Sequence, residues 1–422
     1  MGMAGKTISE KILSAASGRD ARAGDLVVCE VDHALGTDGS MPMALDYFAQ
    51  MDGRRVRHPG RIAIALDHYA PAPNPKTSAL HDRLRAFAAA QGVALWEVGD
   101  GIGHQLMVES GRAVPGSLVV GADSHAVTYG ALNAFATGIG SSDLAAIMLC
   151  GRLWLRVPES IRVTLEGELP VGIYPKDVAL ALAKRLGADG ATYRAMEFHG
   201  SGLARLDLED RLVLSNLCVE MGAKCGVFPA DEKTLSYLDG RARGPFACVA
   251  PDADASYAGE VDVDLRRLTP LLALPHQVDR VVPITEAKGT PVQMVYLGTC
   301  TGGRVRDFHQ ALAVLRNAPR VARGVQLVVT PASREVLAAL ARDGSLQKFV
   351  ELGAVIVTPG CGSCCGTCGA IPGDGVRVIS TANRNFKGRM GNAKAEIYLA
   401  SPASCAAAAV TGKITDPREF LS

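Results

Sequence analysis

Four cysteines lie within eight residues near the C-terminal end of the chain, in the sequence PGCGSCCGTCG. They are Cys361, Cys364, Cys365 and Cys368. A deprotonated cysteine is a soft ligand, and soft ligands bind zinc, Cu(I) or iron–sulfur clusters. The two C-x2-C pairs abut, which leaves little chain to wrap a tetrahedral zinc ion and disfavours a zinc ribbon. Cysteines that only pack as small apolar side chains are a poor match for so glycine-rich a loop.

A further cysteine, Cys300, lies in a second glycine-rich stretch, LGTCTGG. One interpretation joins Cys300 with Cys361 and Cys364 as three thiolate ligands of a single iron–sulfur cluster. Three protein ligands leave one iron of such a cluster open, and an open iron is a Lewis acid. The other cysteines are expected to be buried free thiols: Cys29, Cys150, Cys218, Cys225, Cys248 and Cys405.

Two short segments place a carboxylate next to an imidazole: Asp67-His68 and Asp123-Ser124-His125. A neighbouring carboxylate can orient a histidine ring and raise its pKa toward that of a proton donor. Such a pair can equally be a solvated loop or a helix cap. The pairs alone therefore do not decide between acid–base chemistry and a structural role.

The elements that would position these residues are short apolar runs of strand type, each ending in a polar loop and followed by a helical pattern, as in βα units. They span residues 62–66, 118–120, 292–297, 354–357 and 376–379. Ligands of open α/β sheets bind outside the carboxyl ends of the strands, so one shared cleft is expected there. We expect three lobes, near residues 1–160, 161–285 and 286–422.

Length and composition agree with an ordinary α/β protein of more than one domain. The 422 residues are 48% hydrophobic, and 44 basic and 43 acidic residues leave a net charge of +1, so no bulk attraction to nucleic acid or anionic lipid is expected. No run is long and apolar enough for a membrane span, and the N-terminus does not look like a signal peptide. Eleven cysteines are too sparse for a disulfide scaffold, which favours a reduced, cytoplasmic, metal-binding protein.

Four segments resemble, in this order, signatures of the aconitase superfamily: VGADSHAVTYGALNAFATGIGSSD, LGTCTGGRVRDF, PGCGSCCG and STANRNFKGRMG. The opening GKTISEKIL and the closing YLASPASCAAAAVTGKITDP are similar to the large subunits of the isopropylmalate dehydratase and homoaconitase type. The resemblance implies an α/β fold of three α/β/α lobes around a central cluster cleft, lacking the swivelling fourth domain of single-chain aconitases.

The resemblance also implies a cofactor and a reaction. The cofactor is a 4Fe-4S cluster on Cys300, Cys361 and Cys364, whose fourth iron lacks a protein ligand and binds the substrate's hydroxyl and carboxylate oxygens. The reaction is the reversible loss and addition of water. Hydroxide is a poor leaving group and a proton next to a carboxylate is weakly acidic, so the reaction needs both metal polarisation and proton transfer.

By the same resemblance, the Asp67-His68 pair and the Asp123-Ser124-His125 motif lie at the cluster, and the first pair protonates the departing hydroxyl. His104, in GIGHQL, matches a site histidine of the family. Further matches are Asn216 and Glu220, whose spacing of four puts them on one helical face. A buried Glu220 needs a partner, and His104 is the expected one. The remaining matches are Asn383, Arg384 and Arg389.

The segment ANRNFKGR carries Asn383, Arg384 and Arg389. By the resemblance, these residues are expected to contact the surroundings of the cluster and to bind the substrate carboxylates. A dicarboxylate near an overall neutral protein needs forked, charged donors, and arginine supplies them. The alternative is a surface charge cluster of little energetic value.

Two segments depart from the family pattern. Thr37-Asp38-Gly39-Ser40 stands where many large subunits have His-Asp-Gly-Thr, and Cys300-Thr301-Gly302-Gly303 replaces the more familiar Cys-Thr-Asn-Gly. Neither departure removes a cluster ligand, but both bear on the substrate. Two extra cysteines, Cys365 and Cys368, have no assigned role and are candidates for oxidation.

The family's catalytic base is a serine in a Gly-Ser-Ser-Arg type loop of the swivelling domain. The serines near the end of this chain, Ser401, Ser404 and Ser422, lie in no comparable motif. We therefore expect a separate small subunit to supply the swivelling domain and the base, and the large chain alone to be nearly inactive.

The expected function is a hydro-lyase that dehydrates or isomerises a substituted malate, with 3-isopropylmalate as the default substrate. Homocitrate-series acids and methylated malates are the alternatives. Two other classes compete with this reading. A dinucleotide dehydrogenase is suggested by Gly138-Ile139-Gly140, but Asp143 replaces the third glycine of that fingerprint. A cluster-free RNA-binding regulator would need a basic cleft, which the neutral composition does not support.

Overall fold

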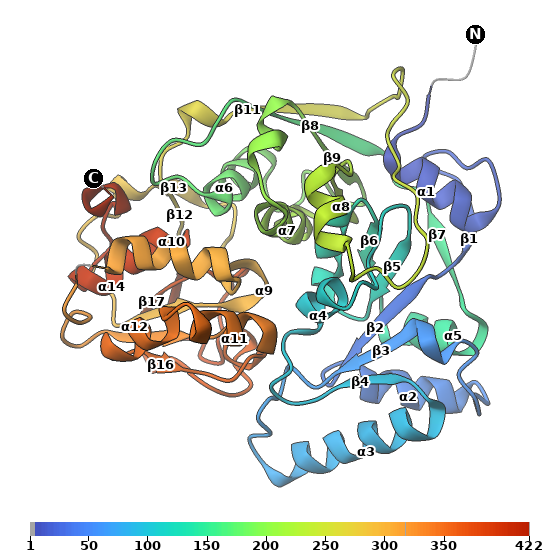
Figure 1. Ribbon diagram of the computed structural model, residues 1–422, viewed down its shortest axis with the longest axis horizontal. Helices are drawn as coiled ribbons and strands as arrows, with labels where there is room; N and C mark the ends of the chain where they lie inside the picture. Colours follow the sequence, from blue (N-terminus) through green and yellow to red (C-terminus); the bar gives the residue numbers. More distant parts are fainter. Residues whose placement is uncertain (1–4, 317, 422) are drawn as a thin grey trace.

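The structure, a computed structural model, describes residues 5–316 and 318–421. Ser422 lies outside the described residues, as do the first four residues of the N-terminal segment. Three large sheets, each with its own helices, follow one another along the chain (Figure 1), and a small two-stranded ribbon is added to them. Among the described residues, no helix is long and apolar enough to cross a membrane.

The first sheet has five parallel strands in the order β4-β3-β2-β5-β6. β3 and β5 are buried along their whole length, as expected for strands with helices on both faces. In chain order the strands are β2 (His33–Thr37), β3 (Ile62–Ala65), β4 (Ala94–Trp96), β5 (Leu118–Gly121) and β6 (Phe135–Gly138). The helices of this part are α2 (Met41–Gln50), α3 (Pro75–Gln91), α4 (Gly103–Glu109) and α5 (Ser141–Cys150), with the 3-10 helices η1 (Pro59–Arg61) and η2 (Ser124–Leu132).

The second sheet has four parallel strands in the order β10-β9-β8-β11. The strands are β8 (Ser160–Glu166), β9 (Ala195–His199), β10 (Cys225–Val227) and β11 (Gly259–Asp264). The helices are α6 (Pro175–Leu186), α7 (Leu208–Leu217) and α8 (Glu232–Leu238), with the 3-10 helices η3 (Ser201–Arg205), η4 (Cys218–Met221) and η5 (Leu265–Arg267).

The third sheet has seven strands in the order β13-β12-β18-β17-β14-β15-β16. Its last five strands are parallel, whereas β12 and β13 pair antiparallel at one edge. The strands are β12 (Leu271–Ala273), β13 (Val281–Pro283), β14 (Met294–Leu297), β15 (Gln326–Val329), β16 (Val355–Ile356), β17 (Arg377–Ser380) and β18 (Glu396–Leu399). The helices are α9 (Thr299–Gly302), α10 (Val305–Leu315), α11 (Arg334–Arg342), α12 (Ser345–Glu351), α13 (Gly362–Cys365) and α14 (Pro402–Thr411), with η6 (Ile284–Glu286) and η7 (Pro417–Phe420).

The N-terminal helix α1 (Ile8–Ser17) links the first two sheets. It begins at a capping box of Thr7 and Glu10, which satisfies backbone N–H groups that a helix start leaves free. Its Ile8 packs in the first core, while the Ile8 N–H donates to Glu197 of β9 at 2.8 Å. A two-stranded antiparallel ribbon, β1 (Leu26–Glu30) with β7 (Arg152–Arg156), lies beside it.

All five apolar runs predicted from the sequence are strands, namely β3, β5, β14, β16 and β17. The expectation for the remaining cysteines is right for four of the six. Cys150 and Cys248 are exposed rather than buried. Cys150 is the last residue of α5 and lies on the outer side of that helix, and Cys248 lies in an irregular segment. Neither position packs its thiol into an apolar core.

Candidate active site

The expected site residues follow the carboxyl ends of strands in the first and third sheets. Asp67 and His68 follow β3, and Asp123 caps η2 directly after β5. Cys300 lies on α9 after β14, and Cys361 precedes α13 after β16. Because parallel strands end on the same edge of a sheet, these loops meet where the two sheets face each other.

Histidines and carboxylates form one hydrogen-bonded network. His68 Nδ1 lies 2.8 Å from Asp67 Oδ1, and its Nε2 lies 3.3 Å from Asp123 Oδ2. The other oxygen of Asp123 lies 2.9 Å from His104 Nε2, whose Nδ1 shares a hydrogen bond of 2.9 Å with the Tyr129 hydroxyl. Two loops and a helix thus converge on the carboxylate of Asp123.

The network fixes where protons reside. Burial opposes a charge on His68, but the carboxylates of Asp67 and Asp123 outweigh burial and raise the pKa of His68 well above its usual value. Burial likewise opposes ionisation of Asp123, but its histidine partners, His104 first, hold the pKa of Asp123 well below its usual value. The two shifts favour a protonated His68 ring facing an ionised Asp123.

A second ion-pair chain runs through Glu220. Its Oε1 lies 2.8 Å from His125 Nε2 and 2.7 Å from Arg384 Nε. Burial disfavours the ionised form of Glu220, but His125 outweighs burial and lowers the pKa of Glu220. Burial also disfavours a charge on His125, but Asp123 and Glu220 outweigh it and raise the pKa of His125. The prediction that His104 pairs with Glu220 is wrong, because the His104 ring contacts Asp123 and Tyr129 instead.

Asn216 and Glu220 do not share a continuous α-helix. α7 ends at Leu217, and Glu220 lies on the following 3-10 turn η4, which tightens the chain before Gly222 at φ 86°. Asn216 Nδ2 donates to the Cys300 sulfur at 3.1 Å, while Glu220 points to the His125–Arg384 pair. Both side chains reach the site, but they serve different parts of it.

Two buried thiols, Cys300 and Cys364, flank Asn383, and the Cys361 thiol lies against Cys364. The Asn383 amide Nδ2 donates to Cys300 Sγ at 3.3 Å, and its Oδ1 lies 3.9 Å from Cys364 Sγ. Burial raises the pKa of the Cys300 thiol to about 12. A hydrogen bond from the Cys361 thiol lowers the pKa of Cys364 well below its usual value. Arg389 Nη2 donates to Cys364 Sγ at 3.3 Å, so a guanidinium stands against this sulfur.

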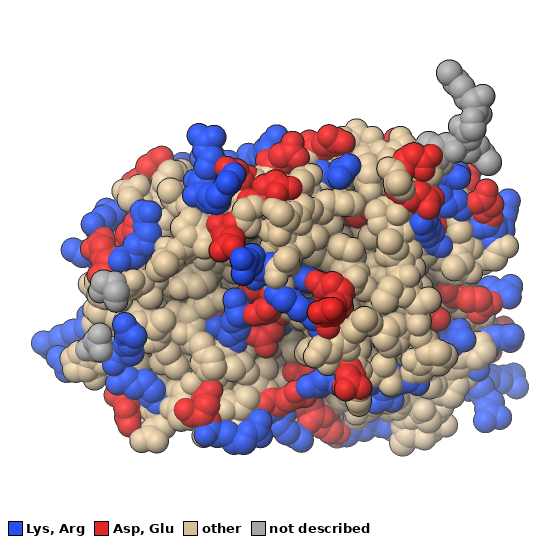
Figure 2. All heavy atoms as spheres, turned by 45° about the horizontal axis from the view of Figure 1, so that its top comes forward, with Lys and Arg blue, Asp and Glu red and all other residues tan. Residues whose placement is uncertain are grey.

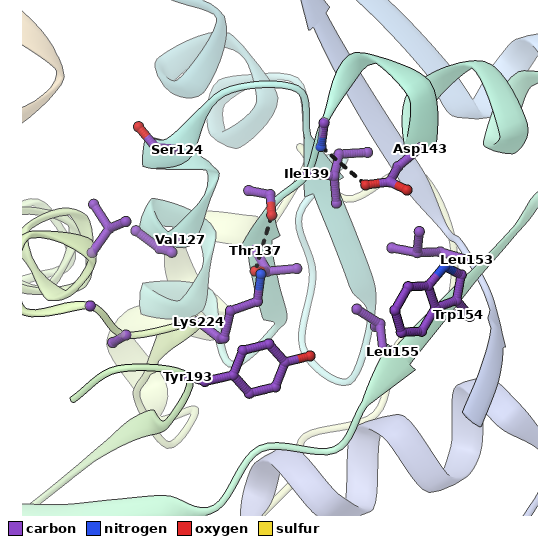
Figure 3. A pocket seen from close by; sticks show the side chains of 15 residues that line it. Ser124, Val127, Thr137, Ile139, Asp143, Leu153, Trp154, Leu155, Tyr193 and Lys224 are labelled. Carbon is purple, nitrogen blue, oxygen red and sulfur yellow. Dashed lines mark hydrogen bonds between the residues drawn. The ribbon is translucent and has the colours of Figure 1, made fainter. Parts of the chain in front are cut away.

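Ser124 lies at the border of the network. Its Oγ is 3.5 Å from His125 Nδ1, and it lines a cavity of about 530 Å³ between the first two sheets. Figure 3 shows this cavity with Lys224 and Tyr193 on one side and Trp154 on the other. The Lys224 ammonium lies 5.4 Å from the centre of the Tyr193 ring, and burial lowers the pKa of Lys224.

Asp38 is a site residue that the sequence analysis noted only as a departure. It is buried, and its Oδ1 accepts the His68 N–H at 2.8 Å while its Oδ2 accepts the Tyr69 N–H at 3.0 Å and lies 2.9 Å from His81 Nε2. Asp38 thereby holds the backbone of the Asp67-His68 loop. Its place directly after a buried strand was the available signal.

Two buried cations were also missed. Lys176, on α6, donates from Nζ to the backbone oxygens of Thr381 at 3.1 Å and Ala382 at 2.5 Å, and burial lowers its pKa to about 8. Arg304 donates from Nε to Gln105 at 2.9 Å and from Nη2 to the Cys300 oxygen at 2.8 Å. Lys176 lies in no motif. Arg304 lies within the signature segment LGTCTGGRVRDF, but no role was assigned to it from the sequence.

Positive and negative side chains alternate over the face of the molecule drawn in Figure 2, without a broad area of one sign. This face therefore offers no basic groove of the kind that nucleic-acid binding uses.

Comparisons with known proteins assign the family. A family model described as "Aconitase family (aconitate hydratase)" matches residues 10–412. The chain belongs to the aconitase family. It is 46% identical to "3-isopropylmalate dehydratase large subunit 1" of Methanopyrus kandleri over 99% of this chain and 100% of that protein. It is also 46% identical to "Homoaconitase large subunit" of Thermus thermophilus, over 99% of this chain and 98% of that one.

The fold comparison agrees. Aconitase X of Thermococcus kodakaraensis in its holo form matches with a TM-score of 0.51 and 12% identity, covering 91% of this chain and 92% of that chain. At this identity the likeness concerns the fold alone, which is the α/β fold of aconitase type expected from the sequence.

Membership of the aconitase family implies a 4Fe-4S cluster, and the donor set fits such a group. The available ligands are three thiols, Cys300, Cys361 and Cys364, buried among backbone and amide groups. Within the described part of the chain, Arg389 Nε is buried without a hydrogen-bond partner beside Cys364, as expected for a cation facing an anionic group. Soft sulfur with a cationic neighbour suits an iron–sulfur cluster.

Proposed function

We propose that this chain is the large subunit of an iron–sulfur hydro-lyase that reversibly dehydrates a substituted malate, with 3-isopropylmalate as the first candidate substrate. The single observation that carries the proposal is a chain of contacts at the ends of strands from two sheets: Asn383 lies between Cys300 and Cys364, Cys361 lies against Cys364, and the Cys361 sulfur lies within 4.8 Å of a ring nitrogen of His68, which faces Asp123. The large-subunit names of the relatives support the same conclusion.

Cys300, Cys361 and Cys364 would hold the cluster. When bound, a cluster with one iron free of protein ligands supplies a Lewis acid that polarises a hydroxyl and a carboxylate. The amides of Asn216 and Asn383 donate to Cys300 Sγ and orient that sulfur. Such hydrogen bonds to the ligand sulfurs help to set the properties of a cluster.

His68 is the acid that we assign to the departing hydroxyl. The ring is held between Asp67 and Asp123, and both carboxylates keep it protonated at neutral pH. A positioned acid contributes about 10²–10⁴-fold to such a rate. His104, on the far side of Asp123, keeps that carboxylate in place.

Arg384 and Arg389 are the cations that we assign to the substrate carboxylates. Arg384 is partly exposed, and Glu220 fixes its Nε, which leaves the outer guanidinium edge for a ligand. Arg389 already faces the Cys364 sulfur, so it serves the cluster and the substrate together. Ser124, beside His125, is assigned to substrate binding at the border of the cavity.

A separate small subunit completes the enzyme in this proposal, because the relatives are named large subunits. It would carry the swivelling domain and the serine that takes the substrate proton. Ser401 and Ser404 do not offer that serine, since both are buried, Ser401 as the cap of α14 and Ser404 in its first turn with its hydroxyl 3.0 Å from that of Ser401. We place the pair in the reducing cytoplasm, where cysteine ligands stay as thiols.

The test is anaerobic reconstitution of the cluster in the purified large chain, followed by assays with and without the small subunit against isopropylmalate, homocitrate-series acids and methylated malates. We expect turnover only from the pair, with Cys300→Ser losing iron and activity and Cys150→Ser, at an exposed thiol, retaining both. Full turnover by the large chain alone, or an unchanged cluster in Cys300→Ser, would refute the proposal.

Homoaconitase activity is the second candidate function. Two relatives with homoaconitase names are 45% and 46% identical to this chain, which is as close as the isopropylmalate dehydratases. The same assay panel separates the two activities, because the preferred acid is the one with the highest kcat/KM.

A further inference from the structure

Cys365 is a thiol of the site that the proposed cluster does not use. Its sulfur, the Cys361 sulfur and a ring nitrogen of His68 all lie within 4.8 Å of one another. We propose that the cluster-free chain binds one zinc-like divalent ion through Cys361, Cys365 and His68, and that this ion and the cluster exclude each other. The exclusion rests on the proposed function, because it takes Cys361 as a cluster ligand.

The backbone presents the two sulfurs as a pair. The Cys365 N–H donates to the Cys361 oxygen at 3.1 Å, the spacing of one helical turn, which puts both side chains on one side of α13. Gly366 then ends the turn at φ 70°, and a Cβ there would meet the Gly391 nitrogen at 2.1 Å. The turn is therefore held against the following chain rather than free to unwind.

His68 is oriented as metal-binding histidines usually are. Its Nδ1 shares a 2.8 Å hydrogen bond with Asp67, and Asp38 accepts its backbone N–H at 2.8 Å. A carboxylate on the second ring nitrogen fixes the tautomer and raises the basicity of a metal-binding histidine. Two thiolates and one imidazole, with water in the fourth position, form a known type of zinc coordination.

The neighbouring cysteines are less suited to this ion. Cys364 faces the Arg389 guanidinium, which repels a second cation. Cys368 Sγ turns to the Ala70 oxygen at 3.3 Å. The sulfur of Cys365, by contrast, lies 3.1 Å from the Cys361 oxygen and 3.5 Å from the Thr367 hydroxyl, and the charged ring near it is that of His68, itself a proposed ligand.

Binding requires a small contraction of the two sulfurs and a release of His68 Nε2 from Asp123, whose Oδ2 lies 3.3 Å from it. Zinc–sulfur bonds of about 2.3 Å in a tetrahedral site bring two sulfurs to roughly 4 Å from each other, within reach of side-chain rotation from the present spacing. The two thiols and the protonated His68 ring each release one proton to the solvent as they bind, and no electron is transferred. Because Cys361 cannot serve both groups, the ion must leave before a cluster can be assembled.

The experiment titrates the full-length, cluster-free chain with Co²⁺ under anaerobic conditions. We expect one ion per chain with a thiolate-to-cobalt charge-transfer band and the visible absorption of tetrahedral cobalt, both abolished by stoichiometric Zn²⁺. Cys365→Ser should weaken binding by more than about tenfold and remove one thiolate from the band. Cys364→Ser and the exposed-thiol control Cys150→Ser should bind as the wild type does. Unchanged binding in Cys365→Ser, or loss of binding in Cys364→Ser, would overturn the site.

A second measurement follows cluster assembly by absorbance and by iron content. Without zinc, Cys365→Ser should load as much cluster as the wild type; a failure to load would make Cys365 a cluster ligand and refute the proposed site. With one equivalent of Zn²⁺, assembly should slow severalfold in the wild type and not in Cys365→Ser; equal rates would refute the exclusion. If neither protein loads a cluster while the cobalt site is present, the proposed function fails and the ion site stands.

Discussion

At the scale of single residues, Asp38 is the support of the proposed acid. Its two oxygens accept the backbone N–H groups of His68 and Tyr69 and face the ring of His81. The imidazole of His68 is aimed by Asp67 and Asp123, but the loop that carries it is held by Asp38. A change at Asp38 should therefore affect stability and catalysis together.

Asp38→Asn replaces one acceptor oxygen with an NH2 group that must face donors. We expect the free energy of unfolding to fall by about 1.5–3 kcal/mol, because buried hydrogen bonds to charged groups have this value. Chemical denaturation of the cluster-free chain measures it, and kcat of the reconstituted enzyme should fall as well. Asp46→Asn, which removes an exposed partner of Arg83, is the control and should stay within about 0.5 kcal/mol of the wild type. A stable Asp38→Asn would show that the loop does not depend on this carboxylate.

The Glu220–His125 pair predicts how stability depends on pH. The raised pKa of His125 gives a contribution that is complete below its unfolded pKa, about 6.5, and is lost as pH rises through the higher folded pKa. The lowered pKa of Glu220 gives a contribution present above about 4.5 and lost as pH falls through the lower folded pKa. The pair is therefore strongest between about pH 4.5 and 6.5.

Glu220→Gln should consequently cost more stability at about pH 5.5 than at about pH 8.5. Part of the loss remains at the higher pH, because Arg384 also pairs with Glu220 and stays charged. Urea denaturation of the cluster-free chain at both pH values measures the difference. Glu396→Gln, at an exposed pair with Arg377, should show little change at either pH. A loss independent of pH would mean that His125 is not charged in this pair.

The contacts of a single residue can be predicted from the sequence when its partners are near it in the chain, and not when they are distant. The Asp67–His68 contact joins chain neighbours and was predicted, whereas the pairing of Glu220 with His125 spans 95 positions and was assigned to the wrong histidine. Lys176 lies in no motif, and Asp38 lies in a segment noted only for its departure from the family pattern. The contacts that make both residues important are with groups of distant loops, which no local pattern records.

At the scale of elements, the glycine-rich loop after β14 interlocks with the loop after β17. A Cβ at Gly302 would lie 2.4 Å from the Thr381 Cβ, and the Thr381 hydroxyl accepts the Gly298 N–H at 2.9 Å while donating to the Gly298 oxygen. The loop of Cys300 can therefore approach the loop of Asn383 only where position 302 has no side chain. The family more often has asparagine two positions after the first ligand. Glycine fits at this position here because Thr381 is the residue that faces it.

Gly302→Ala should push these loops apart. We expect a loss of about 1–3 kcal/mol in unfolding free energy from overpacking, and a faster loss of iron from the reconstituted chain. Denaturation and the rate of iron release to a chelator are the measurements. Gly60→Ala, at a glycine with open space around its Cβ position, is the matched control and should retain both properties. Wild-type iron retention in Gly302→Ala would show that the loops can separate without harm to the site.

The strands were predictable because they are apolar runs with turn residues at their ends, and all five expected runs are strands. The prediction that residues 216–220 lie on one helix is correct for Asn216, which lies on α7, and wrong for Glu220, which lies on η4. Cys218 continues the apolar pattern, but α7 ends before it, and a Cβ at Gly226 would lie 2.4 Å from the Cys218 sulfur. Such close packing between β10 and η4 is a tertiary effect and leaves no periodic signal.

At the scale of the whole molecule, we propose three lobes near the expected boundaries, each built on one of the three sheets. The edge strands β12 and β13 pair in the third sheet, which favours a second boundary near residue 268 rather than 285. Antiparallel pairing of β12 with β18 joins positions 273 and 399, a contact that the sequence does not encode locally. Boundaries were therefore less accessible to prediction than strands.

The junction of the first two lobes depends on Glu197. This buried residue of β9 accepts hydrogen bonds from the Ile8 N–H at 2.8 Å and the Tyr257 hydroxyl at 2.5 Å, and it lies 2.9 Å from His199 Nε2. Glu197→Ala removes the acceptor of the Ile8 N–H, while Tyr257 and His199 keep their mutual contact of 3.2 Å; each donor left unsatisfied should cost about 1–3 kcal/mol. Denaturation and hydrogen exchange of α1 measure this. Glu260→Ala, on the exposed side of β11, is the control. If α1 keeps its protection in Glu197→Ala, the helix is held by apolar packing alone.

The ammonium of Lys176 reaches from the second lobe to two carbonyl groups of the third, next to Asn383. With a pKa of about 8, a sizeable fraction of this amine is uncharged in mildly alkaline buffer, yet it is enclosed where reagents do not enter. An amine-acylating reagent should thus modify Lys176 only when the lobes part. The rate of that acylation, measured by peptide mass mapping, would report how often the lobes separate, and loading of the cofactor should lower the rate.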